Sequence, residues 1–190
     1  MLRFNLLPIF LSLVIFIILI FFLRKKRQKS LTYLLFWSVF YVYIINVIRY
    51  TQFPLFIVEY PFDYHFSNYI QLIPTNPFND ALHTTILNTI LTIPFGFGLP
   101  FLLRIDLKKI LLSALIFSLS IELLQLVPHL LFEGHNRIID VNDVIFNTLG
   151  GLIGYLFFKL FALLFNFVSS KFHFKMNPII SHIDHTVKGS

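Results

Sequence analysis

The stretch NRIIDVNDVIFNTLGGLIGY, residues 136–155, leads from a charged start into a long apolar segment. Arg137, Asp140 and Asp143 come first, and Asn147 already lies inside the apolar part. A carboxylate in the first turn of a helix is stabilised by the helix dipole, and a residue just before that turn caps free backbone amides. We therefore expect a membrane helix to begin here, with Asp140 as its cap and Asp143 in its first turn.

The three glycines of the same stretch predict close helix packing. Gly150 and Gly154 have the G-x-x-x-G spacing, which allows a neighbouring membrane helix to approach closely. With Gly151 and Asn147 they lie on one stripe of the predicted helix. Glycine at these three positions is therefore expected to be structural.

The composition of the whole chain places it in the membrane. Of its 190 residues, 57% are hydrophobic, and the mean hydropathy is +0.79. Soluble domains seldom reach such values. The chain has no cysteine, which excludes disulfides, a thiol nucleophile and a zinc–thiolate site. The sequence therefore predicts an all-α integral membrane protein, formed by one polytopic transmembrane helical bundle.

Five apolar segments are each long enough to cross a bilayer, which requires about 20 residues. They are residues 6–23, 31–48, 83–103, 107–127 and 144–168. The first segment lies where a signal peptide would, but one basic residue precedes it and a basic run follows it directly. We interpret it as a retained anchor, so about five spans are expected.

Basic residues predict the orientation, because lysine and arginine are enriched on the cytoplasmic side. Clusters follow the first, third and fifth segments: Arg24, Lys25, Lys26, Arg27 and Lys29, then Arg104, Lys108 and Lys109, then Lys171, Lys175 and Lys188. Five spans place all three clusters on one side, with the N-terminus outside and the C-terminus in the cytoplasm. The net charge of +6 is thus a topology signal, and no nucleic-acid partner is expected.

Three regions are expected along the chain. Residues 1–49 hold two helices and their basic loop, residues 50–168 hold an aromatic outer loop and three helices, and residues 169–190 form a polar cytoplasmic tail, disordered or peripheral. The outer loop, residues 50–82, is rich in tyrosine, phenylalanine and proline. Such a loop lies in the membrane–water interface as an anchoring belt, or it covers a site as a lid.

The segment at 83–103 combines polar residues with helix breakers. Thr84, Asn88 and Thr92 share one helix face at the spacing i, i+4, i+8. Two prolines and two glycines follow: Pro94, Gly96, Gly98 and Pro100. These residues kink the helix for packing, or they break it so that free backbone groups line a cavity.

The segment at 107–127 holds an acid that a bilayer disfavours. Ser118, Glu122 and Gln125 lie on one face, and Glu122 is about 8 Å from the outer end of the helix. A charged carboxylate near a bilayer centre costs about 2.5–3.5 kcal/mol, so Glu122 is protonated, paired or in contact with a wet cavity. It is a functional acid or a hydrogen-bond anchor between helices. Arg137 is a candidate partner for it, or a binder of an anionic head group.

Polar residues of three helices converge in the outer half of the predicted bundle. They are Asn88, Glu122, Gln125, Arg137, Asp140, Asp143 and Asn147. We expect them to form a small pocket that opens to the outer leaflet and binds the polar part of a ligand.

His83, His129 and His135 also lie outside, but no pair has the H-E-x-x-H spacing of a metal site. We interpret them as interfacial and expect no metal or other cofactor.

Four pieces of the sequence resemble the VanZ-like membrane protein family. They are IQLIPTNPF (70–78), NTILTIPFGFGLP (88–100), SLSIELLQL (118–126) and NRIIDVNDVIFNTLGGLIGY (136–155). The first piece departs from the family's pattern by having Thr75 and Asn76 between its proline and the PF pair. The pattern carries over onto Asn88, Pro94, Gly96, Glu122, Gln125, Arg137, Asp140, Asp143, Asn147 and Gly151.

The resemblance implies a multi-pass protein of the bacterial plasma membrane, and the family's named member is associated with low-level resistance to the lipoglycopeptide teicoplanin. One interpretation is an envelope protein that binds an outer-leaflet lipid-linked wall precursor or a lipoglycopeptide. A second is an intramembrane enzyme that acts on a lipid head group, with Glu122 as general acid or base. A third is a small lipid or solute transporter. Whether the protein is an enzyme stays open. Membrane lipids are expected partners, and a homo-oligomer is compatible with each function.

Overall fold

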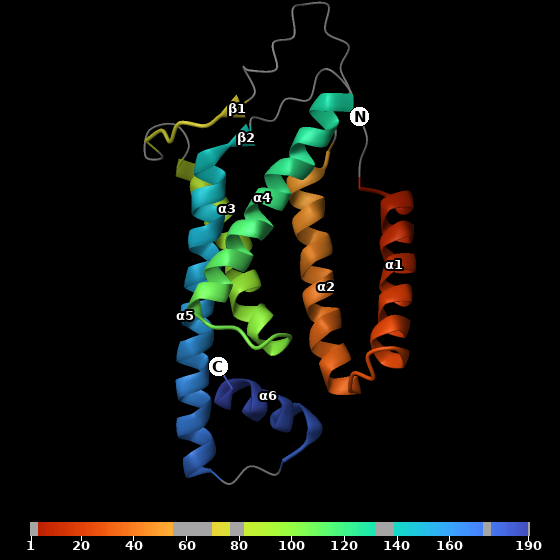
Figure 1. Ribbon diagram of the computed structural model, residues 1–190, viewed down its shortest axis with the longest axis vertical. Helices are drawn as coiled ribbons and strands as arrows, with labels where there is room; N and C mark the ends of the chain where they lie inside the picture. Colours follow the sequence, from red (N-terminus) through yellow and green to blue (C-terminus); the bar gives the residue numbers. More distant parts are fainter. Residues whose placement is uncertain (1–3, 55–69, 77–81, 132–138, 173–175, 190) are drawn as a thin grey trace, which may run out of the picture.

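Five long helices form the protein in the computed structural model (Figure 1). They are α1 (Leu6–Lys25), α2 (Leu31–Gln52), α3 (Leu82–Gly98), α4 (Leu107–Leu131) and α5 (Val141–Lys171). Each is long and apolar enough to cross a membrane, α3 together with the 3-10 helix η2 (Leu99–Phe101) that continues it. The prediction of an all-α bundle with about five spans is therefore confirmed. The structure describes residues 4–54, 70–76, 82–131, 139–172 and 176–189.

Helices α3 and α5 make the closest packing in the bundle, and the G-x-x-x-G pair explains it. A Cβ atom at Gly150 would collide with the carbonyl oxygen of Thr89, and one at Gly154 with the carbonyl oxygen of Ile93. The backbone of α3 therefore occupies the space that side chains would fill. The close contact at this pair is of the kind that the G-x-x-x-G spacing predicts.

Three further small residues extend this packing and bring α4 into it. A Cβ atom at Gly96 would collide with the carbonyl oxygen of Gly151, so α3 and α5 also touch one turn further along. On its other side, a Cβ atom at Gly151 would lie 2.6 Å from the Cβ atom of Ala114 on α4. The three helices that carry the predicted site are thus packed through small residues, which is the usual way for membrane helices to approach closely.

Helix α3 continues through Pro94 and is not broken there. Pro94 lies inside the helix, which ends at Gly98 and tightens into η2. The hydroxyl of Tyr43 on α2 donates to the Leu91 carbonyl oxygen at 2.8 Å and holds α2 against this part of α3. A helix broken at Pro94 is therefore not what the structure shows, although Pro94 and Gly98 do line an apolar cavity between the helices.

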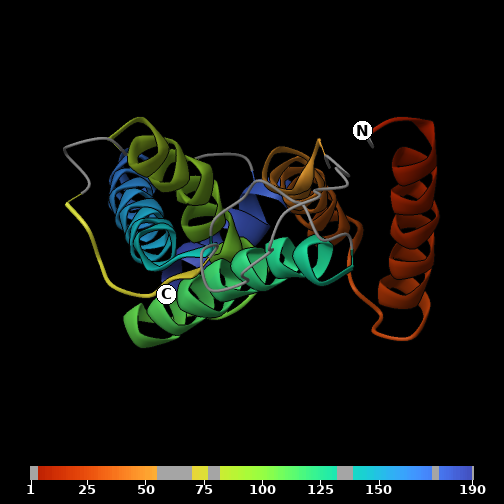
Figure 2. The same ribbon diagram turned by 90° about the horizontal axis from the view of Figure 1, so that it is seen from above.

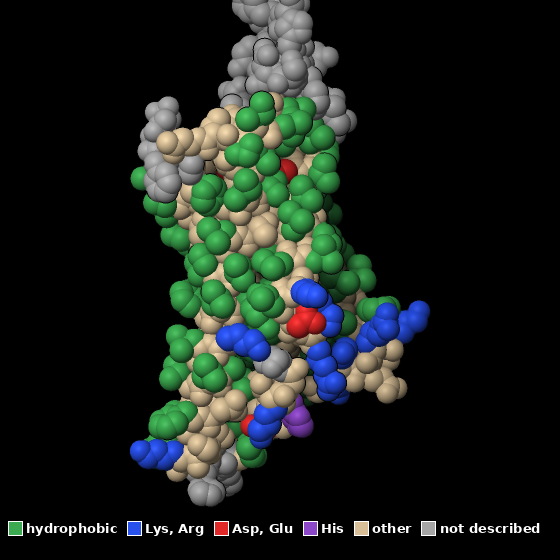
Figure 3. Space-filling model, turned by 60° about the vertical axis from the view of Figure 1, so that its left-hand side comes forward, with side chains coloured by type: hydrophobic (Ala, Val, Ile, Leu, Met, Phe, Trp, Pro, Cys, Tyr) green, Lys and Arg blue, Asp and Glu red, His purple; other side chains and the backbone are tan. Residues whose placement is uncertain are grey.

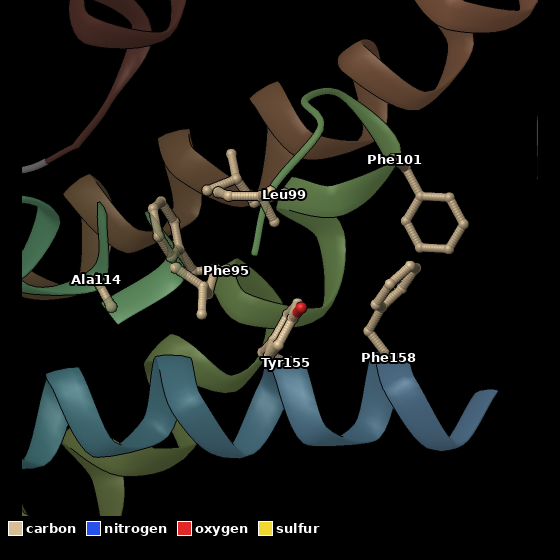
Figure 4. Packing of buried hydrophobic residues seen from close by; sticks show 8 residues of the cluster. Phe95, Leu99, Phe101, Ala114, Tyr155 and Phe158 are labelled. Carbon is tan, nitrogen blue, oxygen red and sulfur yellow. The ribbon is translucent and has the colours of Figure 1, made fainter. Parts of the chain in front are cut away.

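Aromatic residues fill the core from Phe95 towards η2. Phe95 stacks on Phe117 of α4 with ring centroids 4.3 Å apart, and Phe101 meets Phe158 of α5 edge to face at 5.4 Å. Figure 4 shows side chains of this cluster pointing into the space between the helices. The polar residues of the predicted site lie on the other side of Gly96, so the bundle has an aromatic half and a polar half.

Helix α1 lies at the edge of the molecule and packs mainly against α2 (Figure 2). The hydroxyl of Tyr41 donates to the Ser12 carbonyl oxygen at 2.6 Å, and Phe16 stacks on Trp37. No residue of α1 is buried, in a helix that the structure describes completely. Its apolar side chains are therefore exposed on nearly every side, as expected for a helix that faces lipid.

The C-terminal region forms a sixth helix, which the sequence had not indicated. Helix α6 (Pro178–Lys188) starts at Asn177, whose side chain accepts hydrogen bonds from the Ile179 and Ile180 amides. It folds back across the end of the bundle, and Val187 is buried there. Within the predicted tail at 169–190, α5 extends to Lys171 and residues 178–188 form α6.

Candidate functional site

The buried polar side chains of the described residues come from four helices. They are Thr51 and Gln52 on α2, Thr85 and Thr92 on α3, Ser118, Glu122 and Gln125 on α4, and Asn142 and Asn147 on α5. The last turn of α2, the first two thirds of α3, the part of α4 from Ser118 onward and the first turns of α5 lie towards the same end of the bundle (Figure 1). We call these residues, together with Asn88 and Asp140, the polar site.

Glu122 lies beside the start of α5. Its side chain is 3% exposed, and the amide of Asp140 donates to its Oε2 atom at 3.4 Å. Asp140 is also the N-cap of α5, because its Oδ1 atom accepts from the Asn142 amide at 2.8 Å. The predicted cap is therefore confirmed. The acid is thus buried against a backbone amide at the positive end of a helix, a position that favours a carboxylate.

Gln125 joins α4 to α2. Its Nε2 atom donates to the carbonyl oxygen of Thr51 at 3.1 Å, and Gln52 donates in the other direction to the carbonyl oxygen of Ile121 at 3.4 Å. Thr51 and Gln52 are both buried at the C-terminal end of α2. The side-chain amide of Gln125 thus holds the wall of the site together, and α2 is part of that wall.

Three buried polar atoms of the site have no hydrogen-bond partner among the described residues. They are the Nδ2 atom of Asn88, the Oγ atom of Ser118 and the Oδ1 atom of Asn147. They come from α3, α4 and α5. Almost all buried polar groups in native proteins are hydrogen-bonded, and one that is not costs about 1–3 kcal/mol. These three atoms therefore have hydrogen-bonding capacity that the described residues do not use.

The packing brings these atoms to similar depths. Thr92 donates to the carbonyl oxygen of Asn147 at 2.7 Å, and its hydroxyl lies 3.2 Å from the carbonyl oxygen of Asn88. Ala114 packs on Gly151, and α4 runs antiparallel to α5. Ser118 lies one turn from that contact along α4, and Asn147 lies one turn from it along α5, both towards the polar end. All three side chains therefore lie within about one turn of each other along the bundle axis.

A short parallel sheet places part of the outer loop next to the site. Strand β1 (Ile70–Gln71) pairs with β2 (Ile139–Asp140), so that Gln71 lies opposite Asp140. Thr75 then accepts hydrogen bonds from Asn142 at 2.9 Å and from Gln71 at 3.0 Å. Residues 70–76 are therefore fixed against the start of α5. The rest of the predicted loop at 55–69 and 77–81, which decides between belt and lid, lies outside the described residues.

The structure thus brings together Asn88, Glu122, Gln125, Asp140 and Asn147, and it places Asp143 in the first turn of α5 as predicted. Arg137, the predicted partner of Glu122, lies outside the described residues, and so does His135. Thr84 was predicted on the polar face of α3 but is exposed, and Thr85 is buried in its place. The buried face of α3 runs through Thr85, Thr92 and Gly96, so it includes the predicted Thr92 but not Thr84.

Sequence reasoning missed the contributions of Thr51, Gln52, Thr75 and Asn142. Their signal is weak, because each is a single polar residue at the end of an apolar segment or in a loop. Ser118 and Thr92 are on the predicted polar faces but carry no charge, and only burial shows their part in the site. Over the parts of the chain that the structure describes, no three residues of the histidine, cysteine or acidic types come together as a group that could hold a metal ion.

A bundle of five membrane helices, with a buried acid and buried amide and hydroxyl groups at one end, defines a polytopic membrane protein with a polar intramembrane site. A model of the VanZ/LLP1 family matches residues 8–163, from α1 into α5. The chain belongs to this family, and the resemblance seen in the sequence is confirmed. The match also covers α1 and α2, which carry none of the four motifs. Comparisons with curated proteins and with solved structures gave no match.

Proposed function

We propose that the polar site binds the polar head of an outer-leaflet amphiphile in the bacterial plasma membrane, either a lipid-linked wall precursor or a lipoglycopeptide. The observation that supports this most is the set of three buried atoms without a partner among the described residues. Asn88 offers a donor, Asn147 an acceptor and Ser118 both, in the same part of the bundle as a buried carboxylate. Such a set fits a head group rich in hydroxyl and amide groups.

Membership of the VanZ/LLP1 family supports a link to teicoplanin-type resistance. In this proposal Glu122, held by the Asp140 amide, meets a donor on the head group, and Arg137 meets an anionic group. The segment 70–76 borders the site, and the aromatic part of the loop covers the acyl chain. The ligand enters from the lipid, since all surrounding helices are of membrane-spanning length.

Drug susceptibility tests the resistance part of the proposal. Cells of a Gram-positive host would express the wild type, Glu122→Gln, Ser118→Ala or Ser120→Ala at matched membrane levels. Ser120 is exposed two residues from Ser118, and its hydroxyl already donates to the Ile116 carbonyl oxygen, so it is the matched control. We expect teicoplanin protection from the wild type and from Ser120→Ala, and loss of it in the other two. Equal protection in all four variants would contradict the proposal.

Photocrosslinking tests the binding part separately. A photoreactive residue at position 118 would capture a lipid-linked precursor or teicoplanin in membranes, whereas the same residue at position 120 would capture only bulk phospholipid. Identical adducts at the two positions would exclude a head-group site, whatever the susceptibility result.

One observation favours a second function, catalysis on a lipid head group. The burial of Glu122 beside a helix N-terminus is an arrangement suited to a general acid or base. Purified protein incubated with prenyl phosphates and phospholipids, with magnesium present, would then release a product that Glu122→Gln does not release. If the wild type turned over neither prenyl phosphates nor phospholipids, ligand binding would be left as the function of Glu122.

A further inference from the structure

The opposite end of the bundle holds a cavity lined by basic residues. It has a volume of about 360 Å³ and lies between the start of α2, the connection from η2 to α4, and α6. Lys29, Arg104, His182 and His185 line it. Figure 3 shows lysine and arginine gathered over this end, below a broad hydrophobic surface.

The acids near this cavity form ion pairs with other cations. Asp106 pairs with Lys109 at 3.2 Å, and Asp184 pairs with Lys188 at 2.7 Å. The amide of Lys109 also donates to Asp106 and lowers the pKa of that carboxyl. Lys29 and Arg104 have no ion pair within the described part of the chain. They are therefore available to an anion from outside.

Contacts with Tyr33 and Phe101 hold the side chains of Lys29 and His182 in place. The Nζ atom of Lys29 lies 4.5 Å from the ring centroid of Tyr33, a cation–π contact. The Nε2 atom of His182 lies 2.9 Å from the carbonyl oxygen of Phe101 and donates to it, since a carbonyl only accepts. The helix that closes the cavity is thus fixed to η2, and the cavity is a built feature of the fold.

An apolar cavity of the same volume, about 360 Å³, lies directly beside the basic one. It runs between α2, α3, α5 and α6, and its walls include Val39, Phe40, Phe97, Phe161 and Ile183. Val39 is 66% exposed, so the cavity borders the lipid-facing surface of α2. Its lining is of the kind that accepts an acyl chain.

The two cavities share one wall. Phe101 lines both, and the adjacent residues His182 and Ile183 of α6 line one each. Phe36 stacks on Phe101 at 5.2 Å and on His182 at 4.8 Å, so aromatic rings separate the basic space from the apolar space. A cationic space next to an apolar groove matches a molecule with a charged head and a hydrocarbon tail.

We propose that this end of the protein binds an anionic phospholipid of the adjacent leaflet. Its phosphate meets Lys29 and Arg104, and one acyl chain lies in the apolar cavity. Basic pockets between membrane helices are known to hold such head groups. The occupant is a lipid and not a soluble phosphate compound, because a soluble compound would leave the apolar cavity without a role. This site is independent of the polar site at the other end.

Titration of the full chain in a neutral detergent tests the proposal. The probes are dioleoyl phosphatidylglycerol, dioleoyl phosphatidylcholine and glycerol phosphate, and native mass spectrometry counts the bound molecules. We expect phosphatidylglycerol to bind well above the other two. Lys29→Ala and Arg104→Ala should each weaken it about fivefold, in line with one lost charge near a membrane surface. Lys29→Arg should keep most of the affinity.

Two further variants separate the head from the tail. Lys108→Ala removes an exposed charge at the same end that does not line the cavity, and it should leave binding unchanged. Val39→Trp fills the apolar cavity from its exposed rim and should weaken phosphatidylglycerol binding, with the melting temperature of the lipid-free protein unchanged. Three results would each overturn the assignment. They are equal binding of the two phospholipids, an equal loss of phosphatidylglycerol binding in Lys108→Ala, and displacement of phosphatidylglycerol by glycerol phosphate at the same concentration.

Discussion

The residues that carry the proposed function differ in how visible they are in a sequence. Glu122 is conspicuous, because an acid in an apolar segment is rare and costly. Ser118 is not, since serine is common in membrane helices and its hydroxyl usually donates to its own helix, as that of Ser120 does. The structure separates the two serines: one is fully buried with no partner among the described residues, and the other is exposed and satisfied.

This difference predicts opposite effects of Ser118→Ala on stability and on function. Removing a buried hydroxyl that lacks a protein partner removes its desolvation penalty, so the free energy of unfolding should stay the same or rise by about 1 kcal/mol. Ligand binding should fall at the same time. Thermal unfolding in detergent, with Ser120→Ala as control, checks the first half. A marked loss of stability would show that the hydroxyl has a structural partner.

Helix packing belongs to the scale of the element, and here the glycines of α5 decide. The G-x-x-x-G spacing predicted that some helix approaches α5, but not which one. The structure shows that α3 meets Gly150 and Gly154, and that α4 meets Gly151 through Ala114. Polar groups from α3, α4 and α5 converge because their backbones are this close.

Gly150→Leu should therefore separate α3 from α5 and disrupt the polar site. The new side chain would collide with the backbone of Thr89, which cannot move aside as a side chain does. We expect a destabilisation at or above the upper part of the usual range of about 1–3 kcal/mol for overpacking. Leu149→Ala, at the neighbouring lipid-exposed position, should be mild by comparison. Unfolding titrations in mixed micelles would measure both, and similar values for the two would contradict the packing described here.

At the scale of the whole molecule, the two ends differ in chemistry. One end has buried amides, hydroxyls and an acid, and the other has the basic cavity and α6. The positive-inside rule predicts that the basic end lies in the cytoplasm. The polar site would then open towards the outer leaflet, as the proposed function requires.

The absence of cysteine from the sequence makes this orientation testable by labelling. Gln28→Cys places a thiol in the basic turn between α1 and α2, and Leu72→Cys places one at an exposed position directly after β1, at the other end. A membrane-impermeant maleimide should label Leu72→Cys in intact cells and Gln28→Cys only after permeabilisation. The reverse pattern would place the polar site on the cytoplasmic side and exclude an outer-leaflet ligand.

The sequence by itself determined the membrane class, the five spans, the cap of α5 and the presence of a polar cluster. These features depend on local composition, spacing and charge, which the chain carries in short stretches. Only the tertiary structure decided that α3 stays unbroken at Pro94, that α2 contacts the site through Gln52 and Gln125, and that α6 completes the basic cavity. Those features arise from contacts between residues far apart in the chain. The local sequence around a packed or hydrogen-bonded group does not determine which distant residue is its partner.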